Sequence, residues 1–390
     1  MKKIRHYVAI TAMVMVAALY PLATQAQISP RTSDGTQRMP DEWLLGSGWR
    51  HYYRTATAPS PSALVFREPR GKETEVVEQA RRLFNNTPVK AMALIDGNEV
   101  VWVDYKAPAS NNSRILSASI GKTVTAMAVG AAMCEGRLLL STRVSELVPE
   151  LADTYLGKST VRDLLRMSSG TQEPPGRDSF VETPAQHNDI NAGRMSFLDL
   201  LRTERVSSQY RRFLSNRQPG EYFSYLSTDP LTLGVMINRA TETTYAKYVE
   251  QRVLIPAGIA RSGIVGQDHF GYGRSDGSIR LTMEDWIRFA AWVKSNSLKN
   301  DCFGNFVREA TQTQISNSSR TRGPAWAGYG YLIWTDNQHS TRDSFWGAGY
   351  GGQRIGWNRS NNRIMIVFSN EEGSYMMDLY RLYANWALLQ

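Results

Sequence analysis

Side chains that commonly bind metals are scarce in this sequence. Its 390 residues include two cysteines, Cys134 and Cys302, and five histidines. Two cysteines are too few for a cysteine metal cluster or a disulfide framework, and no histidine stands in a recognisable metal or serine-triad context. The sequence therefore predicts no metal and no cofactor, and it favours a catalytic base other than histidine.

Long apolar runs are also scarce, with one exception at the N-terminus. Basic residues within the first five positions precede an apolar segment over Tyr7–Leu22, and small residues at Thr24 and Ala26 follow it. This order is typical of a secretory signal peptide, whereas a retained anchor would need a longer stretch without Pro21. We expect residues 1–26 to be removed and the protein to be periplasmic or secreted. No later run is long enough to span a bilayer.

Export leaves two interpretations of the cysteines open. An oxidising compartment permits a disulfide between Cys134 and Cys302. Cys134 also lies in an apolar segment, where a cysteine is commonly a small buried hydrophobic residue. The sequence does not choose between them.

The excess of positive charge is small. The formal net charge of +9 falls to +6 without the signal peptide, because three basic residues and no acidic ones leave with it. The arginines, including the adjacent Arg211 and Arg212, are dispersed along the chain, which is typical of a solvated surface. We expect a small-molecule substrate and no nucleic-acid partner, and the oligomeric state stays open. About 360 mature residues are enough for a large core, in one compact unit or in two closely packed domains.

The most informative segment is Ser119-Ile120-Gly121-Lys122. Apolar and small residues from Ile120 to Met133 predict a buried helix that begins at Ser119. Residues three apart are neighbours on a helix, so the Lys122 amine can reach the Ser119 hydroxyl. Burial disfavours the charged ammonium, and a neutral amine can accept the serine proton. The free N–H groups at the helix start favour negative charge on an attacked carbonyl. As a bare pattern, however, Ser-x-x-Lys occurs by chance in most chains of this length.

Two nearby patterns predict other chemistry and fail. Ile120–Thr123 resembles the end of a phosphate-binding loop, but Leu116 stands where that loop needs a glycine. Gly273–Gly277 fits the Gly-x-Ser-x-Gly nucleophile elbow, but Gln267–Tyr272 before it is no apolar strand. We therefore predict that Ser275 is a loop residue.

Hydrophobic periodicity divides the chain into sheet-forming and helical parts. The expected helices, besides that of Ser119, cover Glu73–Phe84, Thr160–Met167 and Met376–Leu389, and the expected strands cover Met92–Ile95, Val100–Val103, Tyr329–Trp334, Gly352–Trp357 and Arg363–Phe368. The last strand is expected to be central because its apolar run is long. No strand pair is evident from Pro174 to Ile259. We expect a discontinuous sheet domain over 27–150 and 260–390, and a mainly helical insertion domain over 151–259.

Three motifs in this order resemble the penicillin-recognising serine hydrolases, specifically the class C β-lactamase-like family. Ser119-x-x-Lys122 is similar to the first motif, Thr160–Gly170 to the segment that leads into the helical insertion, and Pro219–Ser227 to the Pro-Gly…Phe-x-Tyr-Ser-Asn segment. The resemblance covers nearly the whole mature chain. It implies an α/β (α+β) fold, in which an antiparallel sheet is flanked by helices and carries an all-helical insertion.

The Pro219–Ser227 segment implies two further site residues. Tyr225 stands at the position of the family's catalytic tyrosine, and a phenol beside a cationic lysine can relay protons. Ser227 stands where many members have asparagine, and a serine here is also seen in 6-aminohexanoate-dimer hydrolases. It is placed to bind the substrate or Lys122, although a loop serine satisfied by its own backbone is an alternative.

The family's Lys-Thr-Gly strand is altered in this chain. Trp346-Gly347-Ala348 aligns with it, so the cation and hydroxyl that meet a β-lactam carboxylate are missing. These three residues are still expected to contact the substrate. The resemblance implies that the backbone N–H groups of Gly349 and Ser119 bind the oxyanion. Trp-Gly-x at this strand is similar to β-lactamase-like esterases.

We therefore expect an exported serine hydrolase of the carboxylesterase or amidase type, acting through an acyl-enzyme on Ser119 with Lys122 and Tyr225 as general base and acid. Two alternatives stay open: a β-lactamase or D-Ala-D-Ala carboxypeptidase, and a catalytically silent, ligand-binding family member. Four aromatic residues indicate either an apolar side of the cleft or core packing. These are Trp326, Tyr329, Trp334 and Trp346.

Overall fold

The computed structural model describes residues 37–46, 51–171, 183–203, 218–318 and 325–389. The predicted signal peptide over 1–26 and the Arg211–Arg212 pair lie outside these ranges. None of the helices within them is both long and apolar enough to cross a membrane.

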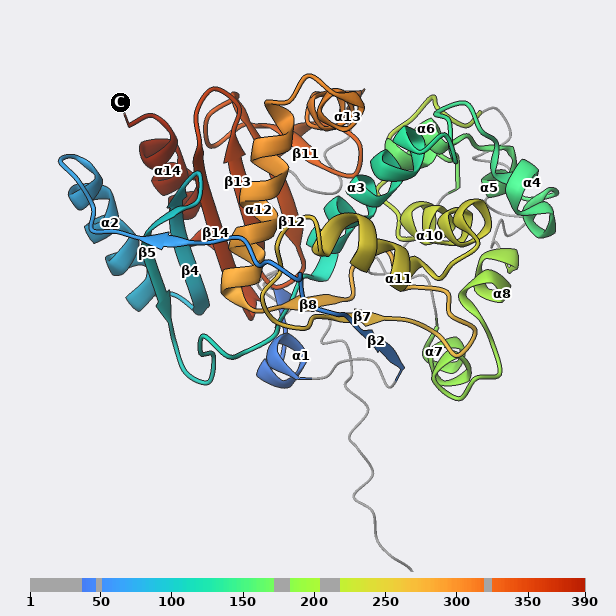
Figure 1. The fold of residues 1–390 in the computed structure, drawn as a ribbon, viewed down its shortest axis with the longest axis horizontal. Helices are drawn as coiled ribbons and strands as arrows, with labels where there is room; N and C mark the ends of the chain where they lie inside the picture. The colour runs from blue at the N-terminus through green and yellow to red at the C-terminus, as the bar shows by residue number, and fades with distance from the viewer. Residues whose placement is uncertain (1–36, 47–50, 172–182, 204–217, 319–324, 390) are drawn as a thin grey trace, which may run out of the picture.

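A nine-stranded sheet forms one side of the molecule (Figure 1). Its strands, in spatial order, are β3 (Val65–Phe66), β5 (Glu99–Tyr105), β4 (Val89–Asp96), β14 (Arg363–Ser369), β13 (Gln353–Asn358), β12 (Ser344–Gly349), β11 (Trp334–Asn337), β10 (Trp326–Tyr329) and β9 (Ile315–Ser316). All pairs are antiparallel except β3 with β5. The apolar strand β14 lies inside the sheet and is buried beyond its first residue, which confirms the predicted central strand. The expected strands Met92–Ile95 and Val100–Val103 lie in β4 and β5, which pair as an antiparallel hairpin.

One predicted strand, Tyr329–Trp334, is wrong. The chain turns between the end of β10 at Tyr329 and the start of β11 at Trp334. Gly330 donates from its backbone N–H to the Ile333 carbonyl at 2.8 Å, and Leu332 has a positive φ of 56°. Every residue of this turn is buried, so its apolar composition matches that of a strand although its backbone reverses direction.

Helices cover both faces of the large sheet. On one face, α14 (Met376–Ala387) and α2 (Glu73–Asn85) pack together, and Trp386 of α14 donates its indole N–H to Ile364 of β14 at 3.1 Å. On the opposite face, α12 (Met283–Ser297) accepts the indole N–H of Trp357 at Ala290 O. Both predicted helices, at Glu73 and at Met376, are confirmed.

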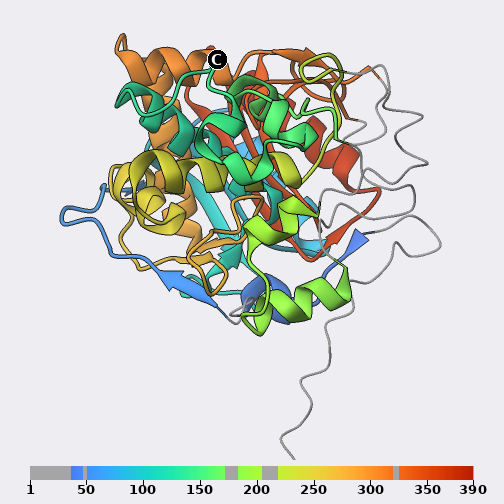
Figure 2. The same cartoon turned by 90° about the vertical axis from the view of Figure 1, so that its right-hand side faces the viewer.

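Helices also dominate the part of the chain predicted as an insertion. The described residues between 151 and 259 form α5 (Tyr155–Lys158), α6 (Val161–Leu165), α7 (Pro184–Asn191), α8 (Phe197–Arg202), α10 (Thr228–Thr241), α11 (Tyr245–Val249) and the π-helical turn η3 (Glu250–Leu254), just after η2 (Pro149–Leu151) and α4 (Val144–Leu147). Figure 1 shows them to one side of the large sheet, and Figure 2 shows them from that side. The domain boundaries at 150/151 and 259/260 stay a prediction.

Two smaller sheets complete the fold. One has the order β2 (Tyr52–Arg54), β7 (Ile264–Gly266), β8 (Ile279–Leu281) and β6 (Ile115–Leu116), and the other pairs β1 (Gln37–Arg38) with β15 (Glu371–Glu372). The helix α1 (Asp41–Leu45) packs beside β6. Strand β6 comes just before Ser119, so this sheet fixes the start of the next helix.

The helix predicted at Ser119 lies between the large sheet and the other helices (Figure 1). A short 3₁₀ turn, η1 (Ala118–Ile120), leads into α3 (Gly121–Cys134), which is buried along almost its whole length. Small residues allow this burial: at Gly130, an added Cβ would collide with the ring of Phe306. The turn η1 contacts β12 and β13, while α3 contacts α10 and α13 (Cys302–Ala310).

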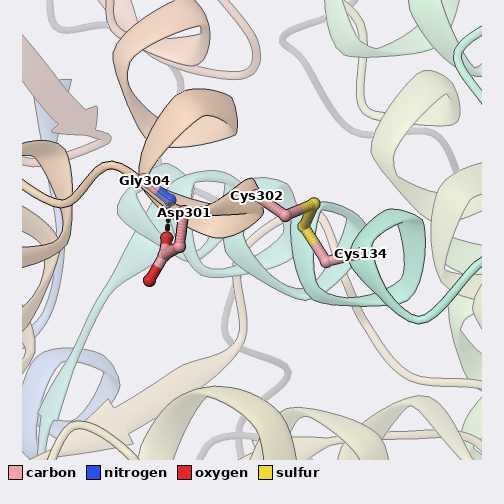
Figure 3. Close-up of a disulfide and its surroundings, with 4 residues drawn as sticks. All are labelled: Cys134, Asp301, Cys302 and Gly304. Carbon is pink, nitrogen blue, oxygen red and sulfur yellow. Dashed lines mark hydrogen bonds between the residues drawn. A yellow bond between two sulfur atoms is a disulfide. The ribbon is translucent and has the colours of Figure 1, made fainter.

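A disulfide joins the C-terminal end of α3 to the start of α13. Cys134 and Cys302 are bonded, with their Cα atoms 5.8 Å apart, and Figure 3 shows the bond beside the N-terminal cap of α13. In that cap, Asp301 accepts the Gly304 backbone N–H at 2.7 Å. Of the two interpretations that the sequence left open, the disulfide is the one present.

Candidate active site

Ser119 and Lys122 lie one turn apart where η1 passes into α3. Lys122 Nζ donates to the Ser119 hydroxyl oxygen at 2.9 Å, and Lys122 is 1% exposed. The i to i+3 spacing on a helical turn brings these two atoms together. A buried amine at this distance can take up a serine proton as the hydroxyl attacks a carbonyl carbon.

The loop Gly273–Gly277 lies against the Lys122 amine, a role that was not predicted from the sequence. Lys122 Nζ donates to the Asp276 carbonyl at 2.7 Å, in addition to its bond to Ser119. The loop is not a nucleophile elbow, because the Ser275 hydroxyl is buried and donates to the Pro230 carbonyl at 2.8 Å. The elbow was thus rightly rejected, but the loop is part of the site. Glycines at both of its ends were the one available signal for a close backbone approach.

Tyr225 lies beside Lys122, as the resemblance implied. The lysine nitrogen is 5.1 Å from the centroid of the Tyr225 ring, within the range of a cation–π contact. The ring stacks on Trp334 with centroids 5.0 Å apart and meets Tyr329 edge-on at 6.1 Å. The three residues predicted to be catalytic are therefore adjacent, and the aromatic residues behind Tyr225 hold its ring in place.

Gly349, at the end of β12, packs directly against the backbone of η1. A Cβ at this position would lie 2.7 Å from the Ser117 carbonyl oxygen and 3.0 Å from the Ser119 nitrogen, so only a glycine fits. β12 pairs with β13 along its whole length, but with β11 only at Phe345 and Trp346. The last residues of β12 therefore face the nucleophile without an intervening strand. This is where a pair of backbone amides could bind an oxyanion.

Trp346 is placed differently from the prediction that it contacts the substrate. It is fully buried, donates its indole N–H to the Ser344 hydroxyl at 2.9 Å, and meets Tyr383 of α14 at 4.5 Å between centroids. Side chains alternate along a strand, so Ala348 shares its face and Gly347 has the opposite one. For Trp346, the alternative interpretation as core packing is the one that the structure supports.

The neighbouring candidates are also largely buried. An added Cβ at Gly347 would lie 3.4 Å from Ile120, so this glycine faces η1. Ser227 is 3% exposed and stands immediately before α10, two residues after Tyr225. Trp334 and Tyr329 support Tyr225, and Trp326 stacks on Trp334 in turn. These aromatic side chains are part of the core and pack against the ring of Tyr225 or against its neighbours.

Asp229 is a site neighbour that the sequence reasoning missed. It lies on the first turn of α10, is fully buried, and accepts hydrogen bonds from the backbone N–H and hydroxyl of Ser169 at 3.2 and 2.7 Å. Burial raises the pKa of this carboxyl to about 7, although its hydrogen bonds oppose the increase. Burial also raises the pKa of Tyr329 well above 10, helped by the nearby charges of Tyr225 and Asp229. The carboxyl is thus electrostatically linked to the aromatic residues around Tyr225.

We also searched the described part of the chain for side chains that could bind a metal ion. Within it, no group of three or more histidine, cysteine, aspartate or glutamate side chains is arranged to hold a metal ion. Among the described residues, the groups next to Ser119 are the Lys122 amine, the Tyr225 phenol and the backbone of Gly349.

Comparison with known proteins identifies similar sequences. The sequence model of the β-lactamase family matches residues 81–390. Protein Flp of Staphylococcus aureus (strain COL) is 30% identical over 158 residues, which cover 40% of this chain and 28% of Flp. The 6-aminohexanoate-dimer hydrolase of Paenarthrobacter ureafaciens is 25% identical over 221 residues, which cover 55% of this chain and 54% of that enzyme. The chain spans less than two thirds of the length of either relative.

Similar folds occur among solved structures. A Bacillus anthracis protein described as a 6-aminohexanoate-dimer hydrolase superposes with a TM-score of 0.72 at 16% identity, covering 89% of this chain and 92% of that one. A D-stereospecific amidohydrolase from a Streptomyces species gives a TM-score of 0.57 at 19% identity, covering 76% and 94%. At these identities the likeness establishes the fold, a β-lactamase-like sheet flanked by helices.

Proposed function

Since its residues 81–390 match that family's sequence model, the chain belongs to the β-lactamase family of hydrolases, and we propose that it cleaves an ester or amide bond through an acyl-enzyme on Ser119. The 2.9 Å contact between the Lys122 amine and the Ser119 hydroxyl is the observation that supports this most directly. The adjacent Gly349 backbone and the Tyr225 ring agree with it.

The proposed reaction has two half-reactions. Ser119 Oγ attacks the substrate carbonyl carbon as its proton passes to Lys122, and the N–H groups of Ser119 and Gly349 stabilise the oxyanion. Lys122 and Tyr225 then deliver the proton to the leaving alcohol or amine, and the acyl group stays on Ser119. In the second half-reaction, water loses a proton to the same pair, attacks the acyl carbon, and releases the acid and the free serine.

The substrate class is proposed from several observations. Two similar proteins are named for amide hydrolysis, a 6-aminohexanoate-dimer hydrolase and a D-stereospecific amidohydrolase. Trp346 and Gly347 stand where β-lactamases have a lysine and a threonine, which argues against efficient β-lactam hydrolysis. A linear amide or an ester is therefore the favoured substrate, ahead of a β-lactam or D-Ala-D-Ala peptide.

Export is part of the same proposal. The Tyr7–Leu22 segment supports a signal peptide, and the disulfide between Cys134 and Cys302 agrees with an oxidising compartment. We propose a periplasmic or secreted protein that acts on a small molecule without a cofactor. Mass spectrometry of the protein secreted by its host would test cleavage after Ala26.

Intact-protein mass spectrometry tests the chemistry. The mature protein is exposed to a p-nitrophenyl ester, a fluorophosphonate, nitrocefin and a linear amide dimer, with Ser119→Ala in parallel. We expect a mass increase that the variant does not show, together with loss of turnover by a factor of at least about 10³. The compound that both labels and turns over assigns the substrate class. Unchanged turnover in a folded Ser119→Ala variant would refute the mechanism, and no adduct with any compound would favour a silent, ligand-binding member.

A further inference from the structure

Three side chains around the nucleophile bind three consecutive carbonyls of the loop Gly273–Gly277. Ser117 Oγ lies 2.9 Å from Gly277 O and equally close to Ala118 O, between which it shares its one proton, and Lys122 Nζ donates to Asp276 O at 2.7 Å. Thr125 Oγ1 donates to Ser275 O at 2.6 Å. The donors follow one direction along the chain and the carbonyls the other, so the loop lies antiparallel along the start of α3. The middle donor is the proposed catalytic base.

Thr125 is also bound from its other side. The Tyr245 hydroxyl of α11 is 2.7 Å from Thr125 Oγ1, and both side chains are buried. Thr125 has one hydroxyl proton, so when it donates to Ser275 O, Tyr245 is the donor to Thr125. Thr125 thereby connects α11, α3 and the loop through a short buried chain of hydrogen bonds.

The loop has little freedom to move on its own. Ser275 donates to Pro230 of α10, and Arg274 Nε lies 3.1 Å from the Asp276 carboxylate. The backbones are also close: a Cβ at Gly277 would lie 2.6 Å from the Ala118 carbonyl oxygen, and one at Gly121 would lie 2.8 Å from Gly277 Cα. Any shift of the loop is therefore passed to the turn that holds the nucleophile.

We propose that Thr125 and Ser117 are positioning residues for acyl transfer, which act by fixing the loop whose Asp276 carbonyl orients Lys122. This inference rests on the proposed roles of Ser119 and Lys122. The amine has two described hydrogen-bond acceptors, Ser119 Oγ and Asp276 O, so the carbonyl helps to set the direction from which the amine meets the hydroxyl. Without the Thr125 bond, the Ser275 carbonyl loses a donor, and a small tilt of the Ser275–Asp276 peptide within the otherwise fixed loop is enough to change the direction of the Asp276 carbonyl and draw the amine away from Ser119.

Thr125→Val tests the inference, because valine keeps the shape of the side chain and removes the hydroxyl. We expect kcat and the acylation rate of Ser119 to fall about 10–100-fold with KM changed less than about twofold, since small misplacements of catalytic groups cost this much. Thr125→Ser restores a hydroxyl at this position and should recover most of the rate. The substrate is whichever ester or amide labels Ser119 in the experiment above.

Thr123→Val is the matched control. Thr123 lies on the same helix and is equally buried, but its hydroxyl has no hydrogen-bond partner among the residues that the structure describes. This variant should keep the wild-type kcat, while Thr125→Val should not. Melting temperatures of all variants, measured in parallel, separate a loss of folded protein from a loss of rate.

Several outcomes would overturn the inference. One is a folded Thr125→Val variant with wild-type kcat, even if it melts at a lower temperature, because Thr125 would then be purely structural. Another is an equal loss of rate in Thr125→Ser and Thr125→Val. If Thr125→Val does not fold, Ser117→Ala takes its place, and wild-type acylation in that variant refutes the inference. Full turnover in Ser119→Ala would instead refute the proposed function, so the two failures can be told apart.

Discussion

Asp229 shows how a single buried carboxyl can connect stability with the site. Its only described hydrogen-bond donors are Ser169, on the segment after α6, and the neighbouring Thr228. These bonds favour the charged form, but complete burial outweighs them and the pKa is raised to about 7. The folded protein therefore holds a proton on Asp229 at pH values where the unfolded chain, with a pKa near 3.8, has lost it.

The pH dependence of stability follows from this difference. Because the folded state binds more protons between about pH 4 and pH 7, the contribution of Asp229 is complete below this window and is lost as pH rises through it. Asp229→Asn should remove that loss, on the order of 3 kcal/mol between pH 5 and pH 8, while its amide oxygen still accepts from Ser169. Urea unfolding of both proteins at the two pH values measures the effect, with the exposed Asp378→Asn as control. Equal pH dependence in Asp229→Asn and the wild type would contradict it.

At the scale of elements, the contact between β12 and η1 brings the last glycine of the strand to the nucleophile. Gly349→Ala should lower kcat by about 100-fold, because its Cβ would overlap the Ser117 carbonyl and push the strand away from Ser119. Gly347→Ala should lose much less, since its Cβ would stay 3.4 Å from the nearest atoms. Steady-state kinetics of the two variants compare the positions. A Gly349→Ala variant as active as Gly347→Ala would argue against an oxyanion site here.

Helices and strands with a clear hydrophobic pattern could be predicted from the sequence. Glu73–Phe84 has a helical stripe, and Ile364–Phe368 is an unbroken apolar run. Both lie in the expected elements. The turn within Tyr329–Trp334 could not be predicted, because aromatic and aliphatic residues there are buried whether the backbone is extended or reversed. Its close approach to Ala310, which Gly330 permits, depends on a tertiary neighbour.

Some residues of the candidate site could likewise be predicted from the sequence, and others could not. Ser119 and Lys122 are three residues apart, so helix geometry alone brings them together. Tyr225 required a resemblance to a known family, because nothing local links it to Lys122. The loop at Asp276 was not predictable, since it offers a backbone carbonyl, which any residue type provides, to a lysine 154 positions away. Trp346 was predicted to contact the substrate but packs in the core, because the sequence of β12 does not show which face of the strand this side chain occupies.

At the scale of the whole molecule, the site lies where the large sheet meets the helical part. Gly349 ends β12 of the sheet, Tyr225 stands three residues before α10, and Ser119 lies in η1 at the start of α3. Figure 1 shows α3 between the large sheet and the helical part. α3 therefore has to keep its position against both neighbours. Burial holds most of its length, and the disulfide between Cys134 and Cys302 ties its far end to α13 (Figure 3).

Removal of the disulfide should lower stability without changing the chemistry. The bond closes a loop between residues 168 positions apart, and a cross-link of this span restricts the unfolded chain by about 3–5 kcal/mol. The double variant Cys134→Ser/Cys302→Ser should lose about this much in urea unfolding, and the wild type should lose it in reductant. Its kcat, measured well below the melting temperature, should stay near the wild-type value, because the bond joins α3 at the end opposite Ser119.

Unchanged unfolding in reductant would mean that the disulfide does not constrain the unfolded chain. A large loss of kcat in the folded double variant would mean that the position of Ser119 depends on both ends of α3, rather than on β12 and the Gly273–Gly277 loop alone.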